Sequence, residues 1–359
     1  MSVVYKKLED VCEILDSRRV PITAKDRKAG AYPYYGANGL QDYVADYIFD
    51  DELVLLAEDG GNFGSKERPI AYRVSGKCWV NNHAHVLKAK PSIHVDYLCY
   101  ALMFYDTEGL VNGATRQKLT QAAMRQMVIP YRDMTEQLQI IEKISQIVRS
   151  IEKRKEELQL LDQLVKSRFI ELYGDPLIED DRYPRVPLGS LAEVGSSKRI
   201  FEKEYVSEGI PFYRTKEIVE LSKGNRITTE LFITKERYDE IRSEYGVPKK
   251  GDLLISAVGT IGVIWIVDGK NDFYFKDGNL LRVSATEKFV PEYLKHLLEA
   301  LISAYKSEMS SGTAYAALTI SALKEMMVYD VPHAEQEQFA AFVEQTDKSK
   351  LCGKMEVAA

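Results

Sequence analysis

The stretch NGATRQKLTQAAMRQMVIP, from Asn112 to Pro130, decides how the rest of this sequence is interpreted. A small-residue turn and a Leu-Thr pair come first, and the remainder predicts a helix and a short apolar strand that ends in proline. About 200 residues later the same order returns as SGTAYAALTISALKEMMVYDVP, from Ser311 to Pro332. A motif of this length that occurs twice indicates an internal duplication.

The duplication extends over both halves of the chain, because further pairs of segments occur in the same order. They read as a Leu-rich helix start, a Pro-aromatic element, a strand that runs into a Gly-rich turn, and the start of an amphipathic helix. After the opening stretch, each half leads through Glu-Gln into another helix. Repeats of this length indicate duplicated domains and not solenoid units. The pairs are KKLEDVCEIL (6–15) with VPLGSLAEVG (186–195), YPYYGANG (32–39) with IPFYRTKEI (210–218), DELVLLAEDGGNFG (51–64) with GDLLISAVGTIG (251–262), and VDYLCYAL (95–102) with PEYLKHLL (291–298).

Between the halves, from about Thr135 to Tyr173, the sequence predicts one long coiled-coil helix that ends at Gly174 and Pro176. Apolar residues recur there every three or four positions, which is the spacing of a coiled-coil seam. At 1.5 Å per residue, about 40 residues would make a rod of about 60 Å that holds two domains apart. The seam is Ile140, Ile144, Ile147, Ile151, Arg154, Leu158, Leu161, Val165, Arg168 and Leu172.

A second helix is expected to pair with the first. It begins with EQEQFAAFVEQ, from Glu335 to Gln345, and its pattern is lost in the following TDKSKLCGKMEVAA. We therefore expect an antiparallel pair whose second helix is about half as long as the first and too short to cover it. The fold class is α+β, with α/β domains at 1–132 and 176–332, a spacer helix at 133–175 and a shortened helix at 333–359.

Composition places the chain among ordinary folded proteins, with 45% hydrophobic and 28% charged residues. No apolar run is long enough for a membrane helix, and the N-terminus lacks the apolar core of a signal peptide, so we expect a cytoplasmic protein. The four cysteines have no CxxC spacing, which argues against a disulfide framework and a zinc site. A net charge of -6 means that any DNA binding must rest on locally placed Lys and Arg.

A duplicated α/β domain with a coiled-coil helix after each copy resembles the DNA-specificity subunit of a type I restriction-modification enzyme. The resemblance covers essentially the whole chain and rests on G-x-x-x-x-x-L-T at 113–120 and 312–319, the strands ending in Pro130 and Pro332, and the Glu-Gln helices. It implies a non-catalytic chain without cofactor or metal, in which each target-recognition domain reads one half of a split DNA sequence. The antiparallel helices would fix the gap, and a 60 Å spacer matches two sites within about two turns of DNA.

The resemblance also implies partners. Two methylation subunits would dock and methylate adenine, and a motor-nuclease subunit would add restriction. The second helix departs from the family, in which it is normally about as long as the first.

Base reading needs Asn, Gln, Arg and Lys at groove edges, with aromatic or small polar residues against sugar and phosphate. Residues 115–118 are the best placed, because they come just before a helix N-cap, Thr120, whose backbone N–H groups favour phosphate. The first domain offers Tyr34, Tyr35, Asn38, Lys66, Asn82, His83, Thr115, Arg116, Gln117 and Lys118; the second offers Arg214, Thr215, Lys216, Asn225, Arg226, Thr260, Lys276, Asn279, Thr313 and Tyr315.

Other interpretations stay open at this point. GGNFGSK (60–66) has glycines of a phosphate loop but lacks its G-x-x-x-x-G-K-[ST] order. His83 and His85 fall on one face of a strand, as a metal pair would, without an obvious third ligand. The chain could also be a protein-binding adaptor built from the same domains, or a single-chain methyltransferase-nuclease. The last would need a [DN]-P-P-[YF] loop, which the sequence lacks.

Overall fold

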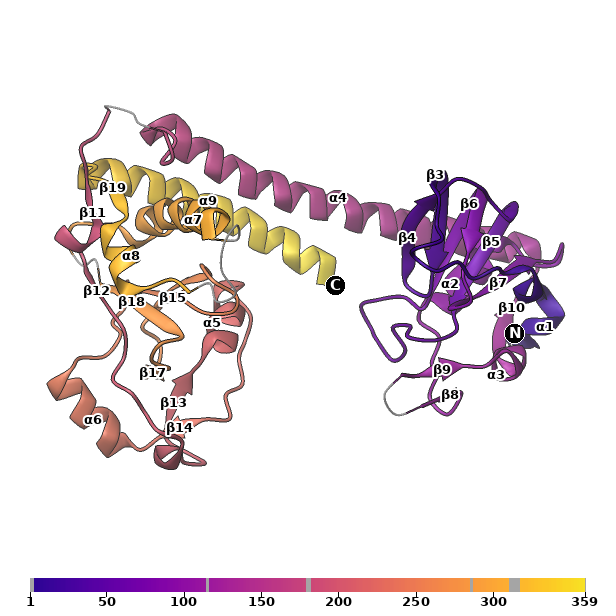
Figure 1. Cartoon of the computed structure of the whole chain (residues 1–359), viewed down its shortest axis with the longest axis horizontal. Helices are drawn as coiled ribbons and strands as arrows, with labels where there is room; N and C mark the ends of the chain where they lie inside the picture. Colours follow the sequence, from indigo (N-terminus) through magenta and orange to yellow (C-terminus); the bar gives the residue numbers. More distant parts are fainter. Residues whose placement is uncertain (1–2, 114–115, 179–181, 285–286, 310–316, 359) are drawn as a thin grey trace. The chain divides into compact units, whose positions relative to one another are not determined.

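The computed structural model describes residues 3–113, 116–178, 182–284, 287–309 and 317–358, with the side chains of the last helix described to Leu351. Contacts divide the chain into two compact units, Met1–Glu152 and Lys153–Ala359. The longest helix, α4 (Met134–Tyr173), contributes its first half to unit 1 and its second half to unit 2. Each unit combines β-sheet with helices, so the fold is α+β (Figure 1).

Unit 1 is built on a six-stranded sheet in the order β2-β7-β5-β6-β3-β4. The central strand β5 lies between two antiparallel neighbours, β7 and β6. Its residues Leu53 to Ala57 are fully buried. A smaller antiparallel pair joins β1 to β10. The strands are β1 (Val4–Lys7), β2 (Cys12–Ile14), β3 (Ala29–Gly36), β4 (Gly39–Val44), β5 (Phe49–Ala57), β6 (Ala71–Val80), β7 (Ala84–Ala89), β8 (Val111–Asn112), β9 (Lys118–Leu119) and β10 (Val128–Tyr131); the helices are α1 (Leu8–Val11), η1 (Asp16–Arg18), α2 (Val95–Met103) and α3 (Gln121–Gln126).

Unit 2 contains a four-stranded sheet, β12-β18-β15-β16, and a three-stranded sheet, β14-β13-β17. Two separate apolar cores fill it, one around α7 and α9 and one around α5 and α6. The strands are β11 (Arg185–Pro187), β12 (Glu193–Gly195), β13 (Ile210–Tyr213), β14 (Phe232–Ile233), β15 (Leu253–Ser256), β16 (Ile264–Ile266), β17 (Tyr274–Phe275), β18 (Leu280–Ser284) and β19 (Met327–Tyr329); the helices are η2 (Leu188–Ser190), η3 (Glu202–Glu204), α5 (Thr215–Ser222), α6 (Lys235–Glu244), α7 (Pro291–Met309), α8 (Ile320–Glu325) and α9 (His333–Ala358).

The two units share one plan, as the sequence predicts. The strand order β2-β7-β5-β6 of unit 1 matches β12-β18-β15-β16 of unit 2. The Pro-aromatic element is a strand in both units, and each copy has a parallel neighbour: Tyr34 pairs with Trp79, and Phe212 pairs with Tyr274. The Leu-rich starts are single helical turns between strands, a shorter form than the expected helix.

The opening stretch forms the predicted helix and strand. The Thr120 side chain caps α3 by accepting a hydrogen bond from Ala123 N. In unit 2 the Thr319 side chain caps α8 by accepting a hydrogen bond from Ala322 N. The strands that follow, β10 and β19, each pair with the first strand of their own unit. The repeated motif therefore closes each unit by joining its end to its beginning.

Helix α4 has 40 residues and α9 has 26, so the second helix is shorter, as predicted. Within unit 2 the two run antiparallel: the hydroxyl of Tyr173 donates to the Glu335 carbonyl at 2.8 Å, and the Lys350 ammonium lies 2.9 Å from the Asp162 carboxylate. Although the apolar pattern weakens after Gln345, α9 continues to Ala358, and Thr346 is still buried and Lys350 still reaches α4.

The seam of α4 differs from the predicted one in two respects. In unit 2 its buried row is Val165, Phe169 and Tyr173, because the aromatic rings of Phe169 and Tyr173 pack edge to face on Phe339 of α9. In unit 1 Ile147 is 60% exposed instead of covered. The other apolar seam residues are half-buried: Ile140, Ile144, Ile151, Leu158, Leu161 and Leu172. Among the helices described, none is long and apolar enough to cross a membrane.

Candidate functional site

Three connections of unit 1 meet at one edge of its sheet. They are the β3–β4 turn, the segment after β5 and the β6–β7 turn. Asn81 N donates to the Tyr35 carbonyl at 3.0 Å, and Glu58 N donates to the His83 carbonyl at 2.8 Å. The Asn38 amide donates to the Gly60 carbonyl at 3.0 Å. These bonds fix the three connections as one surface, which we call the loop edge of unit 1.

The segment that follows β8 completes this loop edge. Leu119 N donates to the Glu58 carbonyl at 2.7 Å, and Gly60 N donates to the Gln117 carbonyl at 3.2 Å. Figure 1 shows the β8–β9 hairpin lying beside the connection that leaves β5. The stretch quoted from the sequence therefore supplies part of the surface as well as part of the scaffold.

Most of the residues predicted to contact DNA in the first domain lie on this loop edge. Side chains that are exposed or half-exposed there are Asn38, Asn82, His83, Arg116, Gln117 and Lys118, with Tyr35 half-buried behind them and Lys66 exposed in the connection after β5. Tyr34 is an incorrect prediction: its ring is 1% exposed, Arg27 stacks over it, and its hydroxyl donates to the Ile22 carbonyl. Thr115 lies outside the described residues.

Unit 2 repeats the same edge with different side chains. Lys276 N donates to the Tyr213 carbonyl at 2.9 Å, Ala257 N donates to the Asn279 carbonyl at 2.8 Å, and Leu318 N donates to the Ala257 carbonyl at 2.9 Å. These three bonds correspond to three bonds of unit 1, those of Asn81 N with Tyr35, Glu58 N with His83 and Leu119 N with Glu58. Three predicted residues, Thr260, Lys276 and Asn279, are exposed or half-exposed on this edge.

The remaining candidates of unit 2 are more scattered. Arg214 is the N-cap residue of α5 and pairs with the buried Glu217 at 3.5 Å; Thr215 is half-buried next to it and Lys216 is exposed. Asn225 binds Glu220 beyond the other end of α5, about 12 Å along the helix, and the exposed Arg226 follows it. The structure therefore does not bring this pair to the loop edge. Thr313 and Tyr315 lie outside the described residues.

A buried network of ionic groups supports the loop edge of unit 1. His85 is fully buried, with Nδ1 2.6 Å from the Asp16 carboxylate and Nε2 2.9 Å from the Leu119 carbonyl. Arg19 donates to Glu58 at 2.6 Å, and Lys118 lies 3.0 Å from the other oxygen of Glu58. The network thus connects η1 and the following Arg19 to residues 118 and 119 of the loop edge.

The charges of this network determine the pKa values of its acids. Burial alone would raise the pKa of Asp16, but hydrogen bonds from His85 and from Val86 N lower it below its usual value. For Glu58, burial likewise acts to raise the pKa, and the hydrogen bonds from Arg19 and Lys118 lower it. Both carboxylates are therefore held in their charged form by neighbouring donors.

Asp16, Glu58 and His85 also place their ligand atoms within 4.8 Å of one another, as a metal site would. In this cluster, positively charged side chains of the protein already occupy the positions beside the carboxylates, where a metal ion would bind. Arg19 contacts both carboxylates, and Lys118 contacts Glu58. We assign the cluster to an ion-pair network. His83 does not join His85 as a metal pair, because its Nδ1 faces Asp59 at 2.6 Å.

Sequence reasoning missed the acids of the loop edge. A DNA-facing surface favours cations, so the predicted DNA contacts did not include the carboxylates Asp59, Glu58 and Asp16. A signal was present: Glu58 and Asp59 directly follow the buried strand β5 and precede the glycine pair at 60 and 61. Polar residues at that point of a strand lie at the sheet edge, where loops gather.

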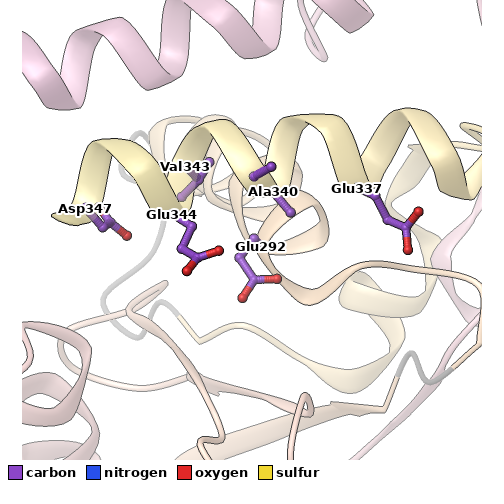
Figure 2. A pocket seen from close by; sticks show the side chains of 7 residues that line it. Glu292, Glu337, Ala340, Val343, Glu344 and Asp347 are labelled. Atoms are coloured by element: carbon purple, nitrogen blue, oxygen red, sulfur yellow. The ribbon is translucent and has the colours of Figure 1, made fainter. Parts of the chain in front are cut away.

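A hollow of about 430 Å³ lies on unit 2 between α7 and α9. Glu292, Glu337, Glu344 and Asp347 line it together with small apolar residues of α9 (Figure 2). Four carboxylates would repel the phosphates of a nucleic acid. This hollow is therefore unsuited to the role that the loop edges suit.

Comparisons with known proteins agree with this arrangement. A family model described as the type I restriction modification DNA specificity domain matches residues 2–161 and 182–353. A protein of Haemophilus influenzae, named as a type I restriction enzyme specificity subunit, is 32% identical over 348 residues, which is 95% of this chain and 87% of that protein. The specificity subunit of the Escherichia coli enzyme EcoprrI is 27% identical over 81 residues, covering 23% of this chain and 19% of that protein.

Solved structures are similar in fold. A type I restriction-modification S subunit from M. genitalium has a TM-score of 0.56 at 15% identity, covering 100% of this chain and 92% of its own. A chain from a study of complex assembly and conformational transition in the type I R-M system has a TM-score of 0.58 at 15% identity, covering 100% of this chain and 94% of its own.

Proposed function

This chain belongs to the family of type I restriction-modification DNA specificity proteins, and we propose that it selects a two-part DNA target, with one unit for each half. The observation that carries this proposal is the repeated loop edge. The same backbone hydrogen bonds build it in both units, while the exposed side chains differ. Two copies of one scaffold with different surfaces suit the reading of two different base sequences.

The exposed polar residues of the loop edges are the proposed DNA contacts. Asn, Gln, Arg and Lys side chains can donate to base edges and phosphates. They supply hydrogen-bond donors, although the chain as a whole carries a net charge of -6 and several of these cations are paired with acids of the same unit. In unit 1 we propose Asn38, Asn82, His83, Arg116, Gln117 and Lys118, and in unit 2 Thr260, Lys276 and Asn279, with Arg214 and Lys216 at the start of α5.

The long helices are the proposed spacer and docking elements. A 40-residue helix such as α4 is about 60 Å long, which suits a fixed gap between two half-sites. Apolar side chains of α4 that remain exposed, including Ile147 and Leu160, suit a surface for methylation subunits. The proposed chain is not itself catalytic: methylation would come from two docked subunits and cleavage from a motor-nuclease subunit.

The test is to produce the full chain together with its methylation subunits in cells that lack other adenine methylation, and to map modified adenines across the genome. The proposal predicts one two-part motif with a constant gap. Cells with the methylation subunits alone are the control and should show no such motif. Methylation without any shared sequence, or a motif that is independent of this chain, would contradict the proposal.

A further inference from the structure

Within unit 1 one arginine is held in a fixed place on the loop edge. The Arg116 side chain is 60% exposed, and its Nη2 lies 2.6 Å from the Asp59 carboxylate. Gly60 leaves the space that the guanidinium occupies: a Cβ there would lie 3.3 Å from Nε and 3.4 Å from Nη2 of Arg116. Gly60 has a φ of +63°, a conformation that glycine adopts without strain.

The carboxylate that holds Arg116 is itself fixed from several sides. His83 Nδ1 lies 2.6 Å from the same Asp59 oxygen, and the backbone of Asp59 pairs with Lys118. Asn38 and Gln117 bind the carbonyl and the N–H of Gly60. Because both Asp59 and Gly60 are tied to neighbouring connections, Arg116 loses little additional freedom when it binds a ligand.

The pair of Arg116 and Asp59 suits a base edge better than a phosphate. A guanidinium has five N–H groups. Nη2 of Arg116 lies 2.6 Å from Asp59 Oδ1 and 3.4 Å from His83 Nδ1, so the N–H groups of Nη1 and Nε remain for a ligand. Asp59 would repel a phosphate brought to these donors more strongly than it would the uncharged edge of a base. Guanine is the base that presents two acceptors, O6 and N7, in the major groove.

We propose that Arg116 reads a guanine in the half-site of unit 1 and that Asp59 is its positioning residue. This inference rests on the proposed function. It applies to one half-site only, because unit 2 has Val258 and Ala317 where unit 1 has Asp59 and Lys118, as their equivalent backbone bridges show. A valine cannot orient an arginine, so unit 2 lacks this pair.

The test compares methylation motifs of the full chain with its methylation subunits, using the wild type, Arg116→Ala, Arg116→Lys and Asp59→Asn. In Arg116→Ala, one guanine position in one half-site should become degenerate, with its preference over other bases reduced about 5- to 150-fold. Arg116→Lys should lose most of that preference, because lysine lacks the planar fork. Asp59→Asn should keep guanine as the preferred base with a reduced preference.

Arg242→Ala is the control, since Arg242 is an exposed arginine of α6 that lies outside both loop edges. Its motif should equal that of the wild type. The proposal is overturned if Arg116→Ala keeps the wild-type motif, or if it lowers methylation equally at every sequence, which indicates a phosphate contact. A wild-type chain that directs no two-part motif would instead overturn the proposed function, so the two failures are distinguishable.

Discussion

At the residue scale, the buried His85 shows how unit 1 supports its loop edge. Each of its ring nitrogens faces an oxygen, the Asp16 carboxylate on one side and the Leu119 carbonyl on the other. Asp16 and His85 therefore form a contact inside the protein, where both side chains are buried. In unit 2 the equivalent strand position holds Leu281, which needs neither partner. The two units thus reach the same backbone arrangement through different side chains.

Removing one member of this pair should destabilise unit 1. His85→Leu removes one of the partners of Asp16 and the side-chain partner of the Leu119 carbonyl, and we expect the free energy of unfolding to fall by about 3 kcal/mol. The chain has two tryptophans, Trp79 in unit 1 and Trp265 in unit 2. A Trp265→Phe background therefore lets fluorescence during urea unfolding report unit 1. The exposed His333→Leu on α9 is the control, and an equal loss in both variants would contradict the prediction.

The same network predicts how acid affects unit 1. The pKa values of Asp16 and Glu58 are lowered in the folded chain, so the folded state favours their charged forms. Their contribution is complete above the usual carboxyl range, about pH 4 to 5, and is lost as the pH falls toward the lowered values. Trp79 fluorescence should show unit 1 losing stability below that range. Asp16→Asn should be less stable at pH 7 and show a shallower acid dependence; an unchanged dependence would count against the assignment.

At the element scale, one glutamine near the start of each long helix joins that helix to its unit, and both glutamines do so in the same way. Gln137 is fully buried, accepts from His94 N and donates to the carbonyls of Ser92 and Arg132. In unit 2 Gln336 repeats this pattern with Val290 N and the carbonyls of Lys288 and Val331. Six hydrogen bonds in matching places explain why the glutamine of the Glu-Gln pair occurs in both halves of the sequence.

Gln137→Met keeps the length of the side chain but leaves one N–H and two carbonyls of unit 1 without their partner. We expect a loss of about 2 to 4 kcal/mol in the unfolding of unit 1 and little change in unit 2. Gln336→Met should show the reverse. The two tryptophans distinguish the transitions, and Gln146→Met, exposed on α4, is the control. Loss in the wrong unit, or none, would show that these bonds do not anchor the helices.

Elements with a strong local signal were predictable from the sequence. The caps Thr120 and Thr319 and the long helix that ends at Gly174 follow from residue types and spacing. The buried row of α4 in unit 2 was not, since Phe169 and Tyr173 face inward only because Phe339 and Tyr293 lie opposite them. That choice depends on tertiary packing, which no local pattern contains.

At the scale of the whole molecule, the duplication explains why the scaffold was predictable from the sequence and why the interactions of the loop-edge side chains were not. The shared positions build the scaffold, so comparing the halves exposed it. The side chains of the loop edge differ between halves, and comparison could only mark them as variable. That Tyr34 is buried and that Asp59 holds Arg116 depends on which connections meet in space. The sequence therefore pointed to residues that lie together at the loop edge of unit 1, but not to the interactions between them.

The proposed spacer role of α4 leads to a prediction about the gap between the two half-sites. A four-residue insertion after Ser150, which is exposed, would lengthen the helix by about 6 Å. Since base pairs are spaced about 3.4 Å apart, the gap of the methylated motif should grow by one to two base pairs. Both half-sites should keep their sequences, because neither loop edge is altered.

Mapping modified adenines in cells that carry the lengthened chain and its methylation subunits measures this directly. Lys155→Gln, exposed on the same helix, keeps the length of α4 and should keep the gap. A lengthened chain that still assembles and methylates with the original gap would mean that α4 does not set the spacing. A changed half-site would mean that the insertion acts through a loop edge, which the independent hydrogen bonding of each edge argues against.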